Sequence, residues 1–566
     1  MLGSQPRRRA LSSALALAVV VPLAIGTTSI ATAAPEAELH KAKPVNTQPT
    51  DNVLYRQSFN DLAAQLQARS SDPDIVDGTV GFTSTAPKGW SVENSESMTG
   101  VGVDEWRGWN FTTREFWVDA EDQMRNRFAR ADNVIAVADS DEFADRNNAP
   151  HDFKTTLVSE GIKVAGQSVV QLSFDSHYRG WAGQSATVTV EFDGSGEQTE
   201  ILRYDSTTVT DNYDGSVLNA NETVDIEVPE GAKTATFRWN FEAEANSWYW
   251  AIDSVSVREV LPAAAMDASD ATSTWVVSDI QGQPGDLAHA FKDLNAVRPD
   301  ASGLLMVGDI VAHGTEAQWN DVNKVMDDAA PILPGTVAAA IGNHESYTSE
   351  PFEVLRDRFL DFADRDRVWD EYVLEGNGGE VPALVLGQEE SRPPEVPMSA
   401  EQLEWFKERL AYWTKQDKQI LVISHFPLGD TASASWIPWY STHYEHNDLL
   451  TGILGDYPNA VMLNGHTHYP FELGDWAVQR RTDGGHPDGF WAVNTGAIQV
   501  EWDARGENTE GISEIVTRDI NRGLTIDVYE DRMVIDARDF GVAGADGTNE
   551  VNDVVRSVTI PNPLKK

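Results

Sequence analysis

The sequence predicts a chain with two folded parts, an all-β sandwich followed by an α/β domain. Residues 51–260 contain short runs in which apolar and polar side chains alternate, with turn signals every ~8–12 residues, as in a β-sandwich. From residue 273 onwards, short apolar runs alternate with segments of helical periodicity, which predicts βαβ units. A length of 566 residues provides enough chain for two such cores.

The first 33 residues predict a signal peptide. Three arginines, Arg7–Arg9, precede an apolar run over 10–25, and residues 31–33 (ATA) match a cleavage site. The alternative is a transmembrane anchor, which is disfavoured because the apolar run is short and no charged stop-transfer segment follows it. We therefore expect export by the Sec or twin-arginine route, a secreted protein without a stable membrane anchor, and a flexible leader over 34–50.

Three segments of the first module show the strand pattern most clearly. Apolar and polar residues alternate over 187–192, 234–241 and 251–257. The end of the module, residues 246–253 (NSWYWAID), resembles the last strands of secreted jelly-roll modules. We therefore expect a jelly-roll-like sandwich in this part of the chain.

Two features of the sandwich suggest ligands. Exposed tryptophans could stack on the sugars of a glycan or cell wall, but we favour core packing for the eight of this module. They are Trp90, Trp106, Trp109, Trp117, Trp181, Trp239, Trp248 and Trp250. A second feature is a set of acidic side chains whose oxygens suit a structural Ca²⁺, although we favour solvated acidic loops. They are Asp139, Asp141, Glu142 and Asp253.

A small, polar linker is expected over 261–272, and the second domain over 273–560. A first helix is predicted by the apolar residues Leu287, Ala290, Phe291 and Leu294, which share one helical face. Two capping boxes predict the starts of further helices, one formed by Thr315 with Gln318 and the other by Ser399 with Gln402. The tail from Leu524 returns to a strand pattern.

The composition excludes several classes of protein. The chain carries 43 basic and 89 acidic residues, a formal net charge of −46, and no cysteine. The missing cysteine excludes disulfide bonds, thiolate zinc sites and a cysteine nucleophile. The negative charge repels phosphate backbones and anionic lipid, so we expect no nucleic-acid binding by charge. A hydrophobic share of 41% indicates folded cores rather than a disordered chain.

Five apolar runs of the second domain each end in side chains that can bind a metal ion. These side chains are Asp279 with Gln281, Asp309, Asn343 with His344, His425, and His466 with His468. In α/β sheets, ligands bind at the carboxyl ends of the strands, so the five runs would bring these groups to one edge. Carboxylate, amide and imidazole donors suit divalent ions such as Mn, Fe and Zn. Glycines beside them permit tight turns and close approach of a substrate.

The order DxQ, GD, GNHE, H and GHTH resembles the calcineurin-like metallophosphoesterase superfamily, in a secreted bacterial form, over about residues 273–500. The resemblance implies an α/β/β/α sandwich with two divalent metal ions. It also implies a role for each motif residue. Asp279 and His468 would hold the first ion, and Asp309 would bridge. The second ion would be held by Asn343, His425 and His466, and His344 would lie near the phosphate and the leaving group.

One residue departs from the family pattern. Gln281 stands where most members have histidine, and its amide either coordinates the first ion or only hydrogen-bonds near it. We expect a weaker first site that favours Mn. A second difference concerns Ala312, which stands where purple acid phosphatases place a tyrosine ligand, so that class is disfavoured.

We therefore expect an exported phosphoesterase that hydrolyses small phosphate mono- or diesters with a hydroxide activated by two metal ions. Asp309 and His344 are the expected catalytic residues, and His344 and Asn343 the expected substrate contacts. His443 and Trp436 are further candidates for substrate contact, because they lie in an aromatic segment that could roof the pocket. The alternative for that segment is packing on its own domain or on the sandwich.

Two other functions stay open at this point. The Asp-x-Gln motif at 279–281 favours a cyclic-nucleotide or nucleotide-pyrophosphate phosphodiesterase. Alternatively, the chain is a glycan- or cell-wall-binding protein with a degenerate phosphoesterase domain, for which Gln281 is the one supporting feature.

Overall fold

The structure, a computed structural model, describes residues 47–565 except 129, 147–151, 206–216, 245, 263–267, 392–394, 434, 442, 483, 503–516 and 542–551. The predicted signal peptide and most of the predicted leader lie outside the described residues. Among the described residues, no helix is long and apolar enough to cross a membrane.

Two antiparallel sheets form the N-terminal module. The first sheet contains β1 (Thr47–Gln57), β2 (Gln67–Ala68), β3 (Val80–Thr83), β5 (Asn110–Thr113), β6 (Val134–Asp139), β9 (Val169–Arg179), β12 (Val217–Glu227) and β14 (Tyr249–Pro262). The second contains β4 (Ser91–Asn94), β7 (Asp152–Val158), β8 (Ile162–Lys163), β10 (Ser185–Phe192), β11 (Gln198–Tyr204) and β13 (Thr234–Glu244). Their orders are β12-β9-β14-β6-β5-β3-β2, with β1 beside β14, and β11-β10-β13-β7-β4, with β8 beside β13. β1 begins within the segment expected to be a leader.

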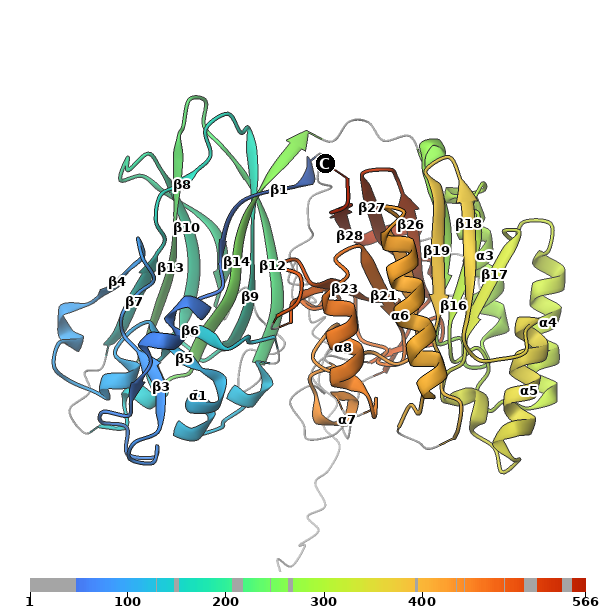
Figure 1. The fold of residues 1–566 in the computed structure, drawn as a ribbon, viewed down its shortest axis with the longest axis horizontal. Helices are drawn as coiled ribbons and strands as arrows, with labels where there is room; N and C mark the ends of the chain where they lie inside the picture. Colours follow the sequence, from blue (N-terminus) through green and yellow to red (C-terminus); the bar gives the residue numbers. More distant parts are fainter. Residues whose placement is uncertain are drawn as a thin grey trace, which may run out of the picture. The chain divides into compact units, whose positions relative to one another are not determined.

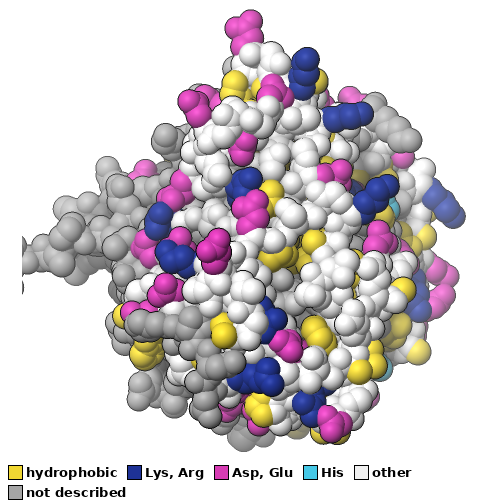
Figure 2. All heavy atoms as spheres, turned by 90° about the vertical axis from the view of Figure 1, so that its left-hand side faces the viewer, with side chains coloured by type: hydrophobic (Ala, Val, Ile, Leu, Met, Phe, Trp, Pro, Cys, Tyr) yellow, Lys and Arg dark blue, Asp and Glu magenta, His cyan; other side chains and the backbone are white. Residues whose placement is uncertain are grey.

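The three predicted strands lie in β10, β13 and β14. Along β10 and β13, buried and more accessible side chains alternate, because one face of an antiparallel sheet covers a core while the other meets solvent. Acidic and basic side chains are interspersed across the face shown in Figure 2, with small apolar patches between them. The short helices α1 (Arg114–Ala120) and α2 (Ser140–Phe143) complete the module.

The tryptophans of the module mostly fill its core. Trp90, Trp106, Trp109, Trp117, Trp239 and Trp250 are buried. Trp248 is half-buried and its neighbour Trp181 is 46% exposed. The core interpretation is therefore confirmed for six of the eight.

An arginine lies among three of the four residues proposed as calcium ligands. The Arg125 guanidinium is buried and makes ion pairs with Asp139 at 2.9 Å and Glu142 at 2.8 Å. Its third partner, Asp141, lies at 3.4 Å. Asp253 has other partners, the backbone N–H groups of residues 132 and 254. The guanidinium thus supplies positive charge next to these acidic groups, and the possible calcium site over all four gains no support. The favoured interpretation as solvated acidic loops is wrong for Asp139, Glu142 and Asp253, which are buried.

Asp141 should make the stability of the protein depend on pH. Burial, and next the nearby Asp139, raise the pKa of Asp141 from 3.8 to about 7. The folded protein therefore holds a proton that the unfolded chain releases, and stability from this group falls as pH rises from about 4 to about 7. The unfolding free energy of the unmodified protein should fall between pH 5 and pH 8. In Asp141→Asn we expect this fall to be smaller by roughly 2 kcal/mol. Chemical denaturation at both pH values measures this. The exposed Asp152→Asn variant is the control, and equal losses in all three proteins would contradict the expectation.

Two further sheets form the second domain. The third sheet has the order β17-β16-β15-β26-β27-β28, from β15 (Thr272–Val277), β16 (Gly303–Val307), β17 (Thr336–Ala340), β26 (Arg522–Val528), β27 (Arg532–Asp539) and β28 (Asp553–Pro561). The fourth has the order β18-β19-β20-β21-β23-β22, from β18 (Asp370–Gly376), β19 (Gly379–Val385), β20 (Ile420–Ile423), β21 (Ala460–Asn464), β22 (Ala477–Arg480) and β23 (Phe490–Asn494). A small pair is formed by β24 (Val500–Trp502) and β25 (Thr517–Asp519).

Helices cover the outer face of each sheet (Figure 1). The third sheet packs on α3 (Pro284–Val297), α4 (Glu316–Ala329) and α5 (Phe352–Ala363), and the fourth on α6 (Ala400–Thr414) and α8 (Asn447–Gly455). A separate apolar cluster lies between the two sheets. These layers follow the expected order α/β/β/α. The predicted N-caps are present, since the hydroxyls of Thr315 and Ser399 accept the backbone N–H three residues on. The return half of each predicted capping box is absent, because the side-chain oxygens of Gln318 and Gln402 accept the backbone N–H groups of His313 and Gly387 instead.

Candidate metal centre

The predicted ligands lie where strands of two different sheets end. β15, β16 and β17 run parallel in the third sheet and lead into Asp279, Asp309 and Asn343. β20 and β21 run parallel in the fourth sheet and lead into His425 and His466. The carboxyl ends of parallel strands share one edge, so the five loops converge. The shared edge expected from the sequence is therefore built from two sheets that face each other.

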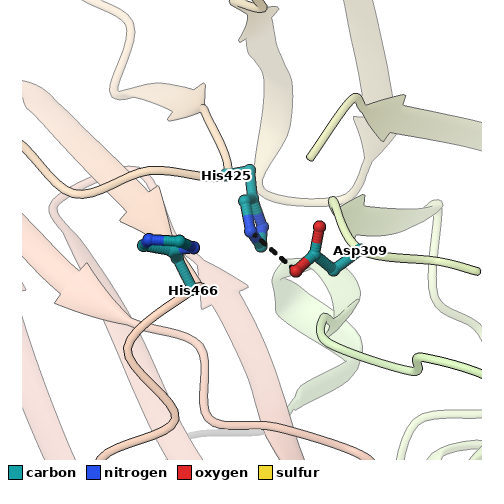
Figure 3. Close-up of side chains that lie close together, drawn as sticks. All are labelled: Asp309, His425 and His466. Atoms are coloured by element: carbon teal, nitrogen blue, oxygen red, sulfur yellow. Dashed lines mark ion pairs between the residues drawn. The ribbon is translucent and has the colours of Figure 1, made fainter. Parts of the chain in front are cut away.

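One group of side chains forms the second predicted site. Asp309, His425 and His466 have donor atoms that all lie within 4.8 Å of one another (Figure 3), and no other such group of three acidic or histidine side chains is found among the described residues. The Nε2 atom of His425 lies 3.1 Å from Asp309 Oδ2 and 3.1 Å from Asn343 Oδ1. The four predicted ligands of this site are thus gathered around the His425 ring.

The residues of the first predicted site also reach Asp309. Asp279 Oδ1 is 3.0 Å from His468 Nε2. The Gln281 side-chain nitrogen donates to Asp309 Oδ2 at 3.0 Å and lies 3.2 Å from His468 Nε2. Asp309 therefore contacts groups of both sites, which is the position that a bridging carboxylate needs.

The donor atoms fit divalent ions in both chemistry and spacing. The closest pairs of ligand atoms are 3.0–3.1 Å apart. At Gln281 the amide nitrogen, which cannot bind a metal ion, faces Asp309 and His468, so the amide must turn before its oxygen can coordinate. Two ligands that bind one ion at about 2.1 Å and at right angles are about 3.0 Å apart. The donors are carboxylate, amide and imidazole groups, which Mn, Fe and Zn accept. Asp279, Gln281 and His468 would hold the first ion together with Asp309.

Backbone carbonyl groups orient three histidines. His425 Nδ1 donates to Val307 O at 2.9 Å, His468 Nδ1 to Val500 O at 2.8 Å, and His344 Nδ1 to Ala312 O at 2.9 Å. A ring that donates through Nδ1 directs the lone pair of Nε2 to the opposite side, here the site. The assignment of donors follows from these acceptors, since the carbonyls cannot donate. His425 and His468 are thereby set to bind an ion before one arrives, and His344 is held facing the cavity.

Charge is concentrated at Asp309 and His425. Burial alone would raise the pKa of Asp309, but the His425 imidazolium beside it brings the pKa well below its usual range. Burial opposes a charge on His425 as well, and the Asp309 carboxylate raises the pKa of His425 to about 9. In the protein without metal, protonated His425 therefore supplies a positive charge next to Asp309. A cation that binds here must displace that proton.

Two glycines let ligand loops approach closely. A Cβ atom on Gly342 would lie 2.2 Å from Asp309 Oδ1, and one on Gly465 would lie 2.3 Å from Asp279 Oδ2. These distances leave no room for any other residue. The sequence predicted that these glycines let a substrate approach the backbone. In the structure, the carboxylates of the site make that approach.

The backbone is strained at the ligand positions. Five residues there have positive φ angles, between 43° and 72°. They are Asp279, Gln281, Asp309, His466 and His468. A left-handed conformation costs these residue types on the order of 1 kcal/mol each, so the surrounding structure must hold them in place.

Gln281→His should strengthen the first site. Imidazole binds Zn²⁺ more strongly than an amide oxygen does, and histidine tolerates the left-handed backbone of this position. We expect roughly tenfold tighter binding of Zn²⁺ at this site, measured by competition with a coloured chelator. The control is Gln283→His, two residues on and exposed. Equal affinity in Gln281→His and the unmodified protein would mean that position 281 does not face the ion.

Several residues of the site were not foreseen from the sequence. Glu345 is fully buried, and its carboxylate accepts the backbone N–H groups of Asp309, Ile310, Val311 and Gly342 at 2.6–3.3 Å. It therefore ties together the loops after β16 and β17. Glu345 belongs to the GNHE motif, so its position was visible, but only the fold shows that its partners are the backbone of another loop.

Aromatic residues from loops without a recognisable pattern also contribute. The Tyr347 hydroxyl accepts the side-chain N–H of Asn343 at 2.8 Å, which turns the Asn343 oxygen toward His425. The Trp502 ring stacks on His468, with ring centres 4.6 Å apart and planes 9° apart. No signal in the sequence would have found either of them.

A cavity of about 380 Å³ opens above the predicted ligands. Its lining includes Gln281, Asp309, Asn343, His344, His466 and His468 from the motifs, together with His443, Tyr440, Tyr347, Phe426 and Trp502. His443 thus lines this cavity, and its contact with a substrate stays a prediction. Trp436 does not line it and is a correction: it is 4% exposed and packs in the hydrophobic cluster of the sandwich, so it cannot contact a substrate directly.

Residues 272–470 match the family model of the calcineurin-like phosphoesterases. This segment, 199 of the 566 residues, is therefore similar to a calcineurin-like metallophosphoesterase domain, which supports hydrolysis of phosphoric esters. No curated protein matches the chain.

Solved structures similar to the chain include three phosphatases or related proteins. A dimetal phosphatase from Danio rerio is 16% identical, covers 52% of this chain and 99% of its own, and has a TM-score of 0.34. A purple acid phosphatase from yellow lupin is 14% identical, covers 73% of this chain and 81% of its own, and has a TM-score of 0.37. A structure of PhoD is 11% identical, covers 75% of this chain and 90% of its own, and has a TM-score of 0.37.

Proposed function

We propose that the chain is an exported metal-dependent phosphoesterase that hydrolyses small phosphate mono- or diesters. The observation that supports it most is the convergence of seven predicted ligands from five strand ends below one cavity of about 380 Å³. A cavity of that size admits a small ester but not a folded macromolecule. Export rests on the signal-peptide pattern of the first 33 residues.

Divalent ions held by these residues would supply Lewis acidity that neutralises charge developing on a phosphoryl group. The residues of the chain do the rest. Asp309 lies between both ligand groups and keeps its negative charge. The backbone N–H of His344 donates to Asp309 Oδ1 at 2.8 Å and so fixes the carboxylate.

His344 is placed to act on the leaving group. Its ring lines the cavity, is one quarter exposed, and is held through Nδ1 by the carbonyl of Ala312. The Nε2 atom lies 3.9 Å from Asp309 Oδ2. From there it can donate a proton to a leaving-group oxygen or stabilise the charge on it.

A cyclic-nucleotide or nucleotide-pyrophosphate phosphodiesterase is the second candidate, which the Asp-x-Gln motif at 279–281 favours. The N-terminal module, which we propose to be a jelly-roll-like sandwich, could still bind glycan through the exposed Trp181. A degenerate phosphoesterase domain is disfavoured by the close spacing of the ligands.

The test is hydrolysis of p-nitrophenyl phosphate and bis-p-nitrophenyl phosphate by the mature protein. The protein is first stripped of metal with a chelator and then reloaded with Mn²⁺, Zn²⁺ or Fe²⁺. We expect turnover to return with metal, with Mn²⁺ the most effective. The ratio of the two substrates separates monoesterase from diesterase. A folded protein that hydrolyses neither ester with any of these ions would overturn the proposal.

A further inference from the structure

The segment over the cavity is anchored in the sandwich. We name residues 436–441 together with 443 the roof segment, which includes α7 (Pro438–Ser441). Trp436, Ile437 and Tyr440 are each at most 4% exposed and belong to the same hydrophobic cluster as the sandwich core. The roof segment is therefore held from the sandwich side as well as by its own domain.

Charged groups of the sandwich reinforce this anchor. The Arg127 guanidinium, in the 3-10 turn Arg125–Arg127, lies 5.7 Å from the centre of the Trp436 ring, within range of a cation–π contact. Next to it, buried Arg130 donates to the carbonyl of Thr431 at 3.4 Å and is paired with Asp175 of β9 at 3.0 Å. Both arginines come from one short stretch between α1 and β6, which thus faces the chain leading into the roof segment.

The other end of the roof segment reaches the metal centre. The Tyr440 ring lies edge-on to His466, with centres 5.6 Å apart, and both line the cavity. His443 is 1% exposed, and its Nε2 lies 3.0 Å from His466 Nε2. The carbonyl of His443 accepts the N–H of Val396 at 2.7 Å, which fixes its backbone. The position of the His443 ring thus depends on a segment whose apolar side chains are buried with the sandwich.

We propose that His443 binds the phosphate group of the substrate and that Arg127 and Trp436 are positioning residues, through which the sandwich holds His443 over the site. His443 lines the cavity beside a predicted ligand, and an imidazole N–H there can donate to a phosphoryl oxygen. For its role in hydrolysis this inference rests on the proposed function. According to this inference, the sandwich contributes to the reaction by positioning a residue that binds the substrate.

Phosphate binding tests the inference without requiring turnover. The Mn²⁺-loaded full-length mature protein is titrated with inorganic phosphate by calorimetry, and bound Mn²⁺ is counted by electron paramagnetic resonance. The variants are His443→Gln, Arg127→Met, the double variant, and the conservative Arg127→Lys. The matched control is Arg56→Met, because Arg56 also joins the sandwich to the second domain, through Asp488 at 2.5 Å, but contacts a loop that does not line the cavity.

We expect His443→Gln to weaken phosphate binding about tenfold, as the loss of a hydrogen bond to a charged group does. Arg127→Met should weaken it about threefold to tenfold, Arg127→Lys should restore most of the affinity, and Arg56→Met should leave it unchanged. Arg127 acts through His443, so the double variant should bind phosphate no more weakly than His443→Gln alone. Each variant should keep the number of bound Mn²⁺ ions.

Three results would overturn the inference. They are unchanged phosphate affinity in His443→Gln, additive losses in the double variant, and loss of a bound Mn²⁺ in His443→Gln, which would make His443 a metal ligand instead. Failure of the proposed function looks different, because the unmodified protein would then hydrolyse neither nitrophenyl ester. The phosphate titration still decides the inference in that case.

Discussion

Asp309→Asn is expected to abolish metal-dependent hydrolysis, with kcat/KM lower by on the order of 10³-fold. Asparagine has the same shape but no charge. It leaves His425, 3.1 Å away, without its carboxylate partner and removes the group that contacts both predicted sites. The backbone contact from His344 can persist, since the amide oxygen still accepts. The loss should therefore fall on metal binding and turnover rather than on folding.

Three measurements separate these effects. Turnover of both nitrophenyl esters gives the catalytic loss, calorimetric titration with Mn²⁺ gives the loss of metal affinity, and thermal unfolding of the metal-free proteins tests the fold. Asp327→Asn, at an exposed position of α4, is the matched control and should behave like the unmodified protein. If Asp309→Asn retained Mn²⁺ affinity and turnover within a factor of a few, the assignment of the bridging carboxylate would be wrong.

Glu345→Gln is expected to destabilise the fold by about 3 kcal/mol and to impair the site as well. The buried Glu345 carboxylate accepts four backbone N–H groups, from the loops after β16 and β17. Glutamine has one acceptor oxygen, and its NH₂ group would face N–H donors that it cannot satisfy. The loops carrying Asp309 and Asn343 would then separate, so metal affinity should fall together with stability.

Chemical denaturation of the metal-free protein measures the first effect, and Mn²⁺ titration the second. Glu353→Gln, on the exposed side of α5, provides the control. Glu345→Asp adds a second check, because it keeps the charge but shortens the side chain, and should recover part of the stability. Stability of Glu345→Gln equal to that of Glu353→Gln would show that the four hydrogen bonds contribute little.

The parts of the protein that could be predicted are those fixed by local pattern. The apolar runs before Asp279, Asp309 and His425 are strands because continuous hydrophobic segments are buried on both faces of a parallel sheet. The N-cap residues Thr315 and Ser399 mark helix starts through contacts three residues apart. The gathering of the predicted ligands could be predicted from the same strand pattern, because the carboxyl ends of neighbouring strands meet at one edge.

The parts that could not be predicted depend on contacts between distant segments. The four acidic residues of the sandwich looked alike in sequence, yet three of them surround Arg125 and Asp253 does not. Trp436 looked like a pocket residue because its neighbours are aromatic, but its ring packs with the sandwich. Neither outcome is encoded in spacing, because Arg125 lies in a separate 3-10 turn 14 residues before Asp139, and the sandwich residues around Trp436 lie hundreds of residues away.

The left-handed backbone at five of the predicted ligand positions also bears on how such sequences diverge. Glycine adopts that conformation without the steric cost that glutamine or histidine carries. A lineage selected for stability alone would therefore accumulate glycine at positions such as Gln281, His466 and His468. Homologues that have lost the activity should be recognisable by glycine there. Engineering for heat resistance should leave these positions unchanged, because the strained residues there are the predicted ligands.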